Sequence, residues 1–516
     1  MTVLAAVAAL VSQAKAQVTA TSVRRATTVT AVPLVMGVDS STQSTKVEVR
    51  DADDGQLVAT GRAPHPATSH TARREQDPKA WWDALVVAIG QTGERDIAAM
   101  SIAGQQHGMV VLDAAGAVLR PAKLWNDTES APEADAMVKQ FGAERWAKAC
   151  GSVPVASLTI TKLAWLARHE SATFERVARV LLPHDYLTYR VTGRYVTDRG
   201  DASGTGYWSP TEDAWRPDLL ERVVGPPADG TWVDRLPEIL GPHEPSDWMT
   251  ASVNDVLGLR GRPLCGPGTG DNMAAALGVG LRAGDVAFSL GTSGTVYTIA
   301  DRPTADGNGF VAGFADATGR FLPLVCTLNA TAVTDAMGRV LGATASELDE
   351  LALDATAGSG GMVLLPYLSG ERTPNRPSAT GALAGITGDV TRAAMARVAY
   401  EGVVCGLLDG LDALHAATGA GDGHDGRTFL VGGGARSLAY RRVVADLSGR
   451  PVTVPATDEH VAMGACVQAA AVLHGCAPME IADAWKLGEG TVIEPDPRVD
   501  RVGLRARYGR LRDGTS

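Results

Sequence analysis

Two similar segments, about half a chain apart, constrain the fold most strongly. In each, a short apolar strand enters a turn of small hydroxyl and glycine residues, and a second strand leaves it. The first copy spans residues 34–50 and the second spans residues 286–299. This spacing is too long for a solenoid repeat. It predicts a duplicated fold whose two halves face each other across a cleft.

Domain boundaries follow from this duplication. The glycine-rich residues 266–284 precede the second copy, so we expect an N-terminal domain at 34–280, a C-terminal domain at 281–500 and a tail at 501–516. Length alone would allow two to four domains at roughly 100–200 residues each. Residues 1–33 lack clean periodicity. We interpret them as a disordered extension or as upstream sequence read from too early a start, with Met36 as a later one.

Strand-like and helical segments alternate between the two hairpins, which predicts an α/β fold with a mixed or parallel sheet covered by helices. The predicted helices span residues 78–90 (capped by Asp77), 131–141, 158–169, 393–417 and 461–473. Two further strands are predicted at residues 98–102 and 428–431.

Charge and cysteine content exclude several classes of protein. The net charge is −11, which provides no basic surface for nucleic acid or for an anionic membrane, so an anionic ligand must be held locally. No apolar run reaches the roughly 18 residues that a membrane span requires. The 6 cysteines form no C-x-x-C pair and accompany no histidine cluster, which indicates reduced thiols in a cytoplasmic protein.

The hydroxyl and glycine turns are suited to phosphate. Their backbone N–H groups and hydroxyls can bind phosphate oxygens, and two facing turns could hold one triphosphate. A third glycine-rich turn lies at residues 432–434. It matches neither the Rossmann nor the Walker pattern, so neither site is indicated. Each turn taken alone has another interpretation, since such turns also simply close hairpins.

Two acidic residues follow strands at these turns. Asp39 begins the first hydroxyl turn, where a carboxylate beside phosphate requires a divalent cation between them, although Asp is also a common turn cap. Asp271 lies among small residues at 266–272 and could accept the proton of a substrate hydroxyl as its oxygen attacks phosphorus. The alternative for Asp271 is an N-cap of a helix over residues 273–277.

A group of mixed polar side chains ends two other strand-like segments. These are Gln106 and His107 in one segment, and Trp125, Asn126 and Asp127 in the other. Amide, imidazole, indole and carboxylate groups together suit the hydroxyls and one flat face of a sugar.

The ordered set of these motifs resembles the FGGY family of carbohydrate kinases. Residues 157–169, S-L-T-I-T-K-L-A-W-L-A-R-H, fit the first signature of that family. The other matching segments, in the expected order, are residues 104–108, 124–127, 270–272, 290–294, 369–374 and 432–437. Together they cover about residues 34–480, and such an ordered set is far more specific than any single member.

The resemblance implies a duplicated actin-like and Hsp70-like ATPase fold of the ribonuclease H type, with ATP and a sugar between two domains. It implies ATP-dependent phosphorylation of a ketopentose, D-xylulose at O5, with Mg²⁺. Asp271 matches the catalytic base, and Asp39 matches the acid associated with Mg²⁺ and activity. The positions expected to contact or neighbour the sugar are Gln106, His107, Trp125, Asn126, Asp127 and Asn272. The positions expected to contact the nucleotide are Thr42, Gly291, Thr292, Ser293, Gly433, Gly434 and Ala435.

One departure concerns the first phosphate turn, where Ser41 stands at a position that the family usually gives to glycine. Either the turn keeps its shape with Ser41 outside the left-handed region, or nucleotide affinity is altered.

Two alternatives remain at this point. The first is the same chemistry on another polyol or ketose, such as ribulose, gluconate or glycerol. The second is an actin-like or Hsp70-like ATP-driven interaction protein, which would leave the sugar-type cluster unexplained. The resemblance also allows a homodimer.

Overall fold

The computed structural model describes residues 32–68, 71–420 and 426–514. Pro33–Ser516 forms one compact unit. The interpretation of residues 1–33 as an extension falls almost entirely outside the described residues.

The first half is built on a seven-stranded sheet with the order β13-β14-β5-β1-β2-β3, in which β15 also pairs with β5. Its strands are β1 Leu34–Ser40, β2 Ser44–Asp51, β3 Leu57–Pro64, β5 Ile97–Gly104, β13 Asp247–Trp248, β14 Leu264–Cys265 and β15 Thr269–Gly270. Six of the seven residues of β1 are buried, which explains its almost continuous apolar sequence.

The second half is built on another seven-stranded sheet with the order β18-β19-β17-β16-β22-β23-β24. Its strands are β16 Val286–Leu290, β17 Gly294–Thr298, β18 Ala312–Ala315, β19 Phe321–Thr327, β22 Thr428–Val431, β23 Val452–Pro455 and β24 Gly490–Ile493. Two-stranded ribbons join β4 Glu75–Gln76 with β7 Ala122–Lys123, β6 Val110–Leu112 with β8 Arg179–Leu181, β9 Val196–Asp198 with β12 Glu238–Leu240, β10 Trp208–Ser209 with β11 Ala214–Trp215, and β20 Val363–Leu365 with β21 Ala382–Ala384.

The two sheets repeat the same local topology. In the first, β1 pairs antiparallel with β2 and parallel with β5. In the second, β16 pairs antiparallel with β17 and parallel with β22. The predicted duplication is therefore confirmed, together with the predicted strands at residues 98–102 and 428–431.

Helices cover both sheets. Those of the first half are α2 Pro78–Thr92, α3 Ala131–Phe141, α4 Ala143–Cys150, α5 Thr159–His169, α6 Ser171–Phe174, α7 Pro183–Thr192, α8 Arg199–Ala202, α9 Pro217–Val224, α10 Ala251–Leu257 and α11 Asp271–Val279. Those of the second half are α12 Thr331–Leu341, α13 Ala345–Asp354, α14 Arg392–Thr418, α15 Leu438–Ser448, α16 His460–His474, α17 Pro478–Ala484 and α18 Arg501–Gly514. All five predicted helices are present. The described part of the predicted tail, Arg501–Gly514, forms α18, which packs on α14.

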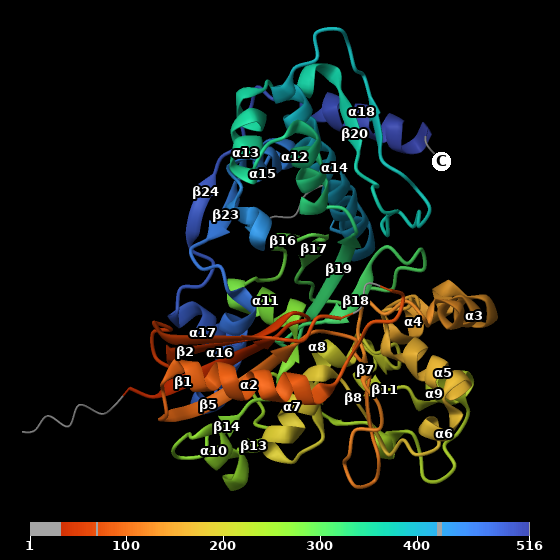
Figure 1. Ribbon diagram of the computed structural model, residues 1–516, viewed down its shortest axis with the longest axis vertical. Coiled ribbons are helices and arrows are strands. Elements are labelled where there is room, and N and C mark those ends of the chain that lie inside the picture. The colour runs from red at the N-terminus through yellow and green to blue at the C-terminus, as the bar shows by residue number, and fades with distance from the viewer. Residues whose placement is uncertain (1–31, 69–70, 421–425, 515–516) are drawn as a thin grey trace, which may run out of the picture. The chain divides into compact units, whose positions relative to one another are not determined.

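The two halves meet through α16. Although it comes late in the chain, α16 packs on β1, β5 and α11, and Figure 1 shows it beside β1 in the lower part of the molecule. A Cβ at Gly464 would lie 1.9 Å from the carbonyl oxygen of Ala274, and one at Gly278 would lie 1.9 Å from that of His460. Glycine at these two positions lets α11 and α16 approach closely, since any side chain would push their backbones apart.

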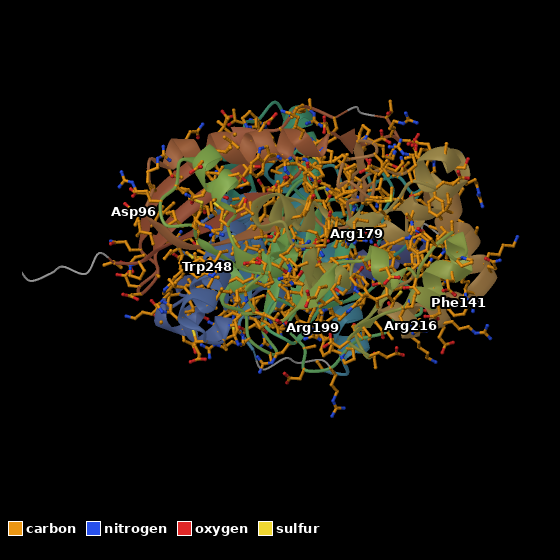
Figure 2. The ribbon with its side chains drawn as sticks, turned by 90° about the horizontal axis from the view of Figure 1, so that it is seen from below. Asp96, Phe141, Arg179, Arg199, Arg216 and Trp248 are labelled. Carbon is orange, nitrogen blue, oxygen red and sulfur yellow. The ribbon has the colours of Figure 1, made fainter. Side chains whose placement is uncertain are left out.

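A separate apolar core supports the side of the first half that carries α3–α6 and α9. Trp146, Leu163 and Trp165 are among its buried residues. Figure 2 shows Phe141, the last residue of α3, at the opposite end of the molecule from Asp96 and Trp248, which belong to the region of the first sheet. This core underlies the loop that precedes α5.

Within the described ranges, no single helix has both the length and the apolar character of a membrane span. The pair α16 and α17, bent by 110° at its break, meets those criteria of length and composition together.

Candidate functional site

Two cavities lie on either side of the second hairpin turn. The central pocket, about 220 Å³, is lined from the first half by residues that include Gln106, His107 and Asp271, and from the second half by residues that include Ser293 and Phe314. The nucleotide-sized cavity, about 1030 Å³, is lined by the glycine turns at 291 and 433–434 and by α12, α13 and α15. The first is smaller than the roughly 300–1,000 Å³ typical of drug-sized ligands, and the second is at the upper end of that range.

Asp271 faces the central pocket from the first turn of α11. The short strand β15 ends at Gly270, which is the N-cap and makes no side-chain cap bond, so the interpretation of Asp271 as an N-cap is wrong. Asp271 Oδ1 accepts hydrogen bonds from Asn272 N at 2.9 Å and Asn272 Nδ2 at 3.1 Å. Burial raises the pKa of Asp271 to about 7, and the charge of Asp39 adds to this effect. A carboxylate with such a pKa can take up a proton near neutral pH.

Asn272 and Gln106 form one hydrogen-bonded unit beside Asp271. Asn272 Nδ2 donates to Gln106 Oε1 at 2.7 Å, and both side chains line the central pocket. Two residues 166 positions apart in the sequence are thus brought together, because β5 and β15 pair at the same edge of the sheet.

His107 is held in the pocket wall by its backbone conformation and by packing of its ring against Phe314. Its φ is 65°, a left-handed conformation that is uncommon for a residue other than glycine. Its ring packs against Phe314 with centroids 5.5 Å apart. Burial lowers the pKa of His107 to about 3, and the positive charges of Lys162 and Arg372 lower it further. The imidazole is therefore neutral, with one donor and one acceptor nitrogen.

Trp125, Asn126 and Asp127 take different positions. Trp125 lines the central pocket, and its Nε1 donates to Thr42 Oγ1 at 2.9 Å. Asp127 lies outside the pocket lining: it is fully buried, it accepts from Arg74 N at 2.8 Å, and both its oxygens lie 3.1 Å from Lys123 Nζ. Asn126 is also outside the lining. Only Trp125 of this group presents its side chain to the pocket.

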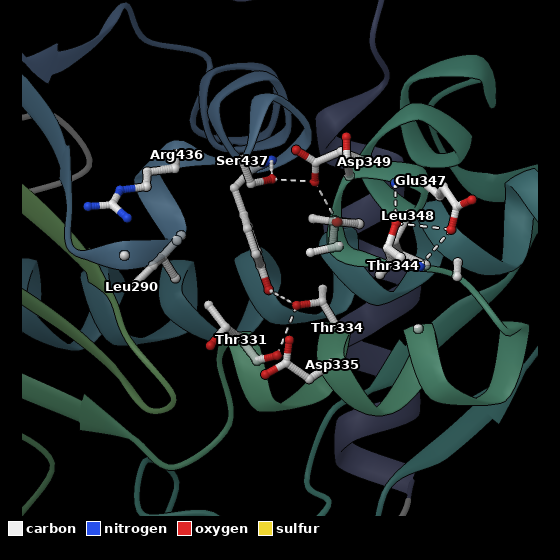
Figure 3. Close-up of a pocket in the computed structure, with 18 of the residues that line it drawn as sticks. Leu290, Thr331, Thr334, Asp335, Thr344, Glu347, Leu348, Asp349, Arg436 and Ser437 are labelled. Atoms are coloured by element: carbon white, nitrogen blue, oxygen red, sulfur yellow. Dashed lines mark hydrogen bonds between the residues drawn. The ribbon is translucent and has the colours of Figure 1, made fainter.

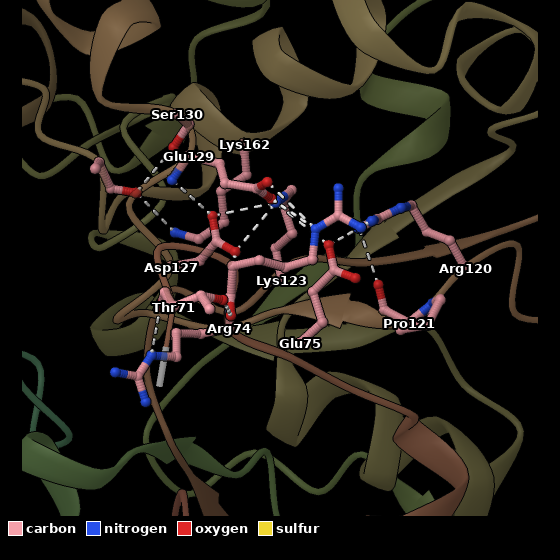
Figure 4. Close-up of polar contacts among 12 residues, drawn as sticks. Thr71, Arg74, Glu75, Arg120, Pro121, Lys123, Asp127, Glu129, Ser130 and Lys162 are labelled. Carbon is pink, nitrogen blue, oxygen red and sulfur yellow. Dashed lines mark hydrogen bonds and ion pairs between the residues drawn. The ribbon is translucent and has the colours of Figure 1, made fainter. Parts of the chain in front are cut away.

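Asp127 instead belongs to a network of buried and partly buried charges. With Glu75 and Glu129 it forms a group of three carboxylates whose oxygens lie within 4.8 Å of one another. The ammonium of Lys123 lies among them, 3.3 Å from Glu75 and 2.6 Å from Glu129 (Figure 4). It also lies 3.9 Å from the ring centroid of Trp165. The cationic side chain therefore occupies the position that a metal ion would need.

The first hydroxyl turn keeps its shape with Ser41. Ser41 is absent from the positive-φ residues of the described chain, and its Oγ donates to Asp39 Oδ1 at 2.5 Å. The first of the two outcomes considered for this position is thus confirmed. Lys46 Nζ lies 3.5 Å from Asp39 Oδ2 and 2.6 Å from Glu459 Oε2, which joins the turn to the start of α16.

Burial raises the pKa of Asp39, and the charge of Lys46 opposes this rise.

The second hairpin turn connects the two cavities. Ser293 lines the central pocket, whereas Gly291 and Thr292 line the nucleotide-sized cavity. Gly433 and Gly434 lie in the second cavity as well, while Ala435 is buried next to them and outside its lining. A phosphate group bound at this turn would therefore lie next to a ligand in either cavity.

The far wall of the nucleotide-sized cavity was not predicted from the sequence. Ser437 Oγ donates to Asp349 Oδ1 at 2.6 Å, and Thr334 Oγ1 donates to the carbonyl oxygen of Thr331 at 2.9 Å (Figure 3). Asp335 and the capping box of α13, formed by Thr344 and Glu347, complete this wall. These helix residues have no local motif, because their proximity depends on how α12, α13 and α15 pack.

The central pocket also contains residues to which the sequence assigned no chemistry. Arg372 lines it, as do the apolar side chains of residues 310–314 and the loop of residues 152–158. The carboxylate of Glu371 accepts from Leu328 N at 2.7 Å, from Asn329 Nδ2 at 3.0 Å and from the backbone N of Arg372 at 2.7 Å. Within the described ranges the two side chains form no ion pair with each other, and Arg372 lines the pocket. Apolar wall residues give no chemical signal in a single sequence.

A second buried polar cluster supports the segment before Asp271. Thr269 Oγ1 donates to Asp198 Oδ2 at 2.6 Å. His184 Nε2 lies 3.1 Å from Asp185 Oδ1 and 3.3 Å from Asp201 Oδ2. Burial raises the pKa of Asp185 to about 7 and that of Asp198 to about 6, and lowers that of His184 to about 3. The cluster fixes Thr269, two residues before Asp271.

Comparisons with known proteins cover almost the whole chain. Residues 34–278 match the model of the FGGY family of carbohydrate kinases, N-terminal domain, and residues 286–473 match that of the C-terminal domain. The xylulose kinase of Streptomyces coelicolor is 46% identical over 487 residues, which is 93% of this chain and 96% of that protein. The xylulose kinase of Escherichia coli is 34% identical over 431 residues, which is 81% of this chain and 85% of that protein.

A solved structure agrees with these sequence comparisons. The crystal structure of xylulose kinase from Bifidobacterium adolescentis has a TM-score of 0.82 and 39% identity with this chain, and the match covers 93% of this chain and 99% of that one.

Proposed function

The chain belongs to the FGGY family of carbohydrate kinases, and we propose that it transfers the γ-phosphoryl group of ATP to O5 of D-xylulose. Its duplicated two-sheet architecture is the actin-like ATPase fold of that family. Relatives that cover 93% of the chain include two xylulose kinases, each 46% identical to it.

One observation carries the proposal: the turn at Gly291–Ser293 lies between a small polar pocket that contains Asp271 and a cavity large enough for a nucleotide. A sugar in the first and the adenosine of ATP in the second would bring the γ-phosphate to the turn. The neutral His107, the Asn272–Gln106 unit and the Trp125 ring offer the polar groups and the flat face that a pentose requires.

Asp271 acts as the general base in the proposed mechanism. Its carboxylate accepts the proton of the sugar O5 hydroxyl as that oxygen attacks the γ-phosphorus, and ADP leaves with the electron pair of the broken P–O bond. Backbone amides and hydroxyls of the two hairpin turns donate to the phosphate oxygens and stabilise the spreading negative charge. Asn272 and Gln106 hold the sugar so that its hydroxyl faces Asp271.

Asp39 is the proposed residue for Mg²⁺. It fits because the charges of Asp39 and Asp271 are close enough for one to raise the pKa of the other, and carboxylate and phosphate oxygens are the ligands that Mg²⁺ prefers. When bound, Mg²⁺ would supply neutralisation of phosphate charge. Lys46, which contacts both Asp39 and Glu459, can leave the first carboxylate without losing its second partner.

We also propose that the protein acts in the cytoplasm. All 6 cysteines are free, which suits a reducing cytoplasm where ATP is available. A homodimer remains a proposal from the family resemblance alone.

A coupled ADP-release assay tests the function. It compares D-xylulose with D-ribulose, gluconate and glycerol in the presence of ATP and Mg²⁺, and we expect the highest kcat/KM with D-xylulose. A higher kcat/KM with another substrate would contradict the assignment of the sugar. ATP turnover that is independent of every sugar would instead support a nucleotide-driven interaction protein.

A further inference from the structure

The first signature segment, residues 157–169, has no role in the proposed mechanism, although it starts next to the central pocket. Its helix α5 begins after Leu158, and that N-cap position makes no side-chain cap bond. The loop of residues 152–158 just before it lines the pocket through Ser152, Val153, Val155, Ser157 and Leu158. Among the described residues, the buried hydroxyls of Ser152 and Ser157 have no hydrogen-bond partner. They are available to a bound ligand.

Lys162 folds back from α5 onto this loop. Its Nζ donates to the carbonyl oxygens of Ala156 at 3.1 Å and Leu158 at 3.4 Å, and makes a shorter contact with that of Ser157. The side chain is completely buried. No carboxylate of the described chain lies within 4.0 Å of its nitrogen, so backbone carbonyls are its direct partners. Figure 4 shows Lys162 beside Asp127 and Glu129.

Thr161 holds the same loop from the neighbouring position. Its Oγ1 donates to Leu158 O at 2.8 Å and also lies 3.0 Å from Ser130 Oγ. Ser130 Oγ in turn donates to Ala156 O at 3.2 Å. Thr159 Oγ1 donates to His107 O at 3.2 Å, which ties the helix start to the histidine in the pocket. The carbonyl groups of residues 156–158 are thus held by side chains of α5 and by Ser130, the N-cap residue of α3.

An ammonium group is costly to bury, so its position in this loop requires an explanation. Burial lowers the pKa of Lys162 to about 7; Asp127 opposes this change, and Lys123 adds to it. A lysine that served only to cover apolar surface would extend its nitrogen to solvent. Lys162 instead donates to the carbonyl oxygens of three consecutive residues, 156–158. These contacts fix the backbone of the loop and therefore the direction of the Ser157 and Leu158 side chains.

We propose that Lys162 is a positioning residue for sugar binding: its ammonium fixes the carbonyls of residues 156–158 and so holds the Ser157 hydroxyl and the Leu158 side chain at the central pocket. This inference rests on the proposed function, because it takes the central pocket as the sugar site. Asp127, which the sequence placed among the expected sugar contacts, does not line the pocket. In this proposal it acts on the sugar site only through its charge, which favours the ammonium form of Lys162.

The test compares Lys162→Met with the wild type. Methionine keeps most of the buried volume and removes the donors. We expect the KM for D-xylulose to rise about tenfold or more, with kcat changed less than the KM and the KM for ATP within about twofold, because the second cavity is remote from the loop. Amide hydrogen exchange across residues 152–158 should become faster. The matched control is Lys148→Met, since Lys148 is exposed and, among the described residues, forms an ion pair only with Glu144, at 2.7 Å. It should leave every value unchanged.

A second variant covers the case in which Lys162→Met does not fold, as judged by its thermal melt and ADP binding. Thr161→Val is nearly isosteric, removes a hydroxyl from the same carbonyls, and should raise the KM for D-xylulose in the same direction. An unchanged KM and unchanged exchange in the folded variants would overturn the inference, as would equal increases in the KM for both substrates.

Failure of the proposed function is recognised separately. A wild-type enzyme without D-xylulose turnover contradicts the function, and the exchange measurement then still decides the role of Lys162. Faster exchange limited to residues 152–158 supports it, and unchanged exchange overturns it.

Discussion

Replacing Gly204 with alanine should damage the sugar site mainly through His107, because the other close contact, with the carbonyl oxygen of Asp201 at 3.3 Å, is far less severe. Gly204 follows α8 and has no left-handed φ, so its backbone accepts alanine without strain. An added Cβ would lie 2.3 Å from His107 Nδ1 and 2.4 Å from its Cε1. The ring has Phe314 beside it and a fixed backbone carbonyl, so it can relieve the contact only by moving within the pocket.

The size of the effect follows from this overlap. Ordinary van der Waals contact begins at 3.4 Å, so the ring must shift by about 1 Å. A misplacement of about 1 Å in an active site can cost up to about 100-fold in rate, which is about 2.7 kcal/mol. We therefore expect kcat/KM for D-xylulose to fall by about 10- to 100-fold, while the KM for ATP stays within about twofold.

Steady-state kinetics with each substrate varied in turn measures this change. The matched control is Gly90→Ala in α2, where an added Cβ has no atom of the described residues within 4 Å apart from the nearby backbone of its own helix. If Gly204→Ala kept its kcat/KM for D-xylulose within about twofold of the wild type, the placement of His107 at the sugar would be refuted.

Three further predictions test other parts of the site. Protonated Asp271 cannot act as a base and its pKa is about 7, so kcat/KM should rise with pH through about 7 and then level off. Asp39→Asn removes the charge that raises this pKa, so it should move the rise in kcat/KM to lower pH. A move to higher pH would contradict the electrostatic effect of Asp39 on Asp271. Gly434→Ala would place a Cβ 2.6 Å from Leu290 Cβ, so it should raise the KM for ATP several-fold and leave that for sugar unchanged, which substrate-varied kinetics can check. Gly464→Ala should lower the free energy of unfolding by about 1–3 kcal/mol in urea denaturation, since its Cβ would meet the Ala274 backbone at 1.9 Å; a loss below about 0.5 kcal/mol would contradict the close packing of α11 on α16.

Local sequence patterns were sufficient for the elements of the fold. The pattern of strand, hydroxyl and glycine turn, and second strand in residues 34–50 and 286–299 predicted both hairpins, because each hairpin pairs residues close in sequence. Helix α2 was predicted with its cap because Asp77 accepts from Lys79 N at 2.9 Å and Pro78 occupies the first turn. The insertion of α16 into the first half could not be predicted, since its small residues show only that it packs closely and not against which partner.

The site was predictable where chemistry and sequence motif coincide. Asp271, Asn272, Gln106 and His107 meet in one pocket, because the ends of β5 and β15 lie side by side. Asp127 has the right neighbours in sequence, but its carboxylate turns away from the pocket toward Lys123. The direction of the Asp127 side chain depends on its pairing with Lys123 in the protein interior. A single sequence does not show which charged side chains pair there.

The parts of the central pocket wall that are built from distant or apolar residues could not be predicted from the sequence either. The pocket segment at residues 310–314 belongs to the second half and contacts His107 only through tertiary packing. Lys162 was part of a recognised signature, but its contacts with the carbonyls of residues 156–158 become visible only when the helix folds back on its own preceding loop.

The central claim is that Asp271 removes the proton from the sugar hydroxyl, and Asp271→Asn tests it most directly. Phosphate transfer from ATP to D-xylulose is measured at saturating substrates for this variant, for the wild type and for Asp83→Asn. Asp83 is an exposed residue of α2 whose carboxylate forms an ion pair with Lys79. The account predicts a loss in kcat of about 100- to 10,000-fold for Asp271→Asn and none for the control. Turnover by Asp271→Asn close to that of the wild type would contradict it.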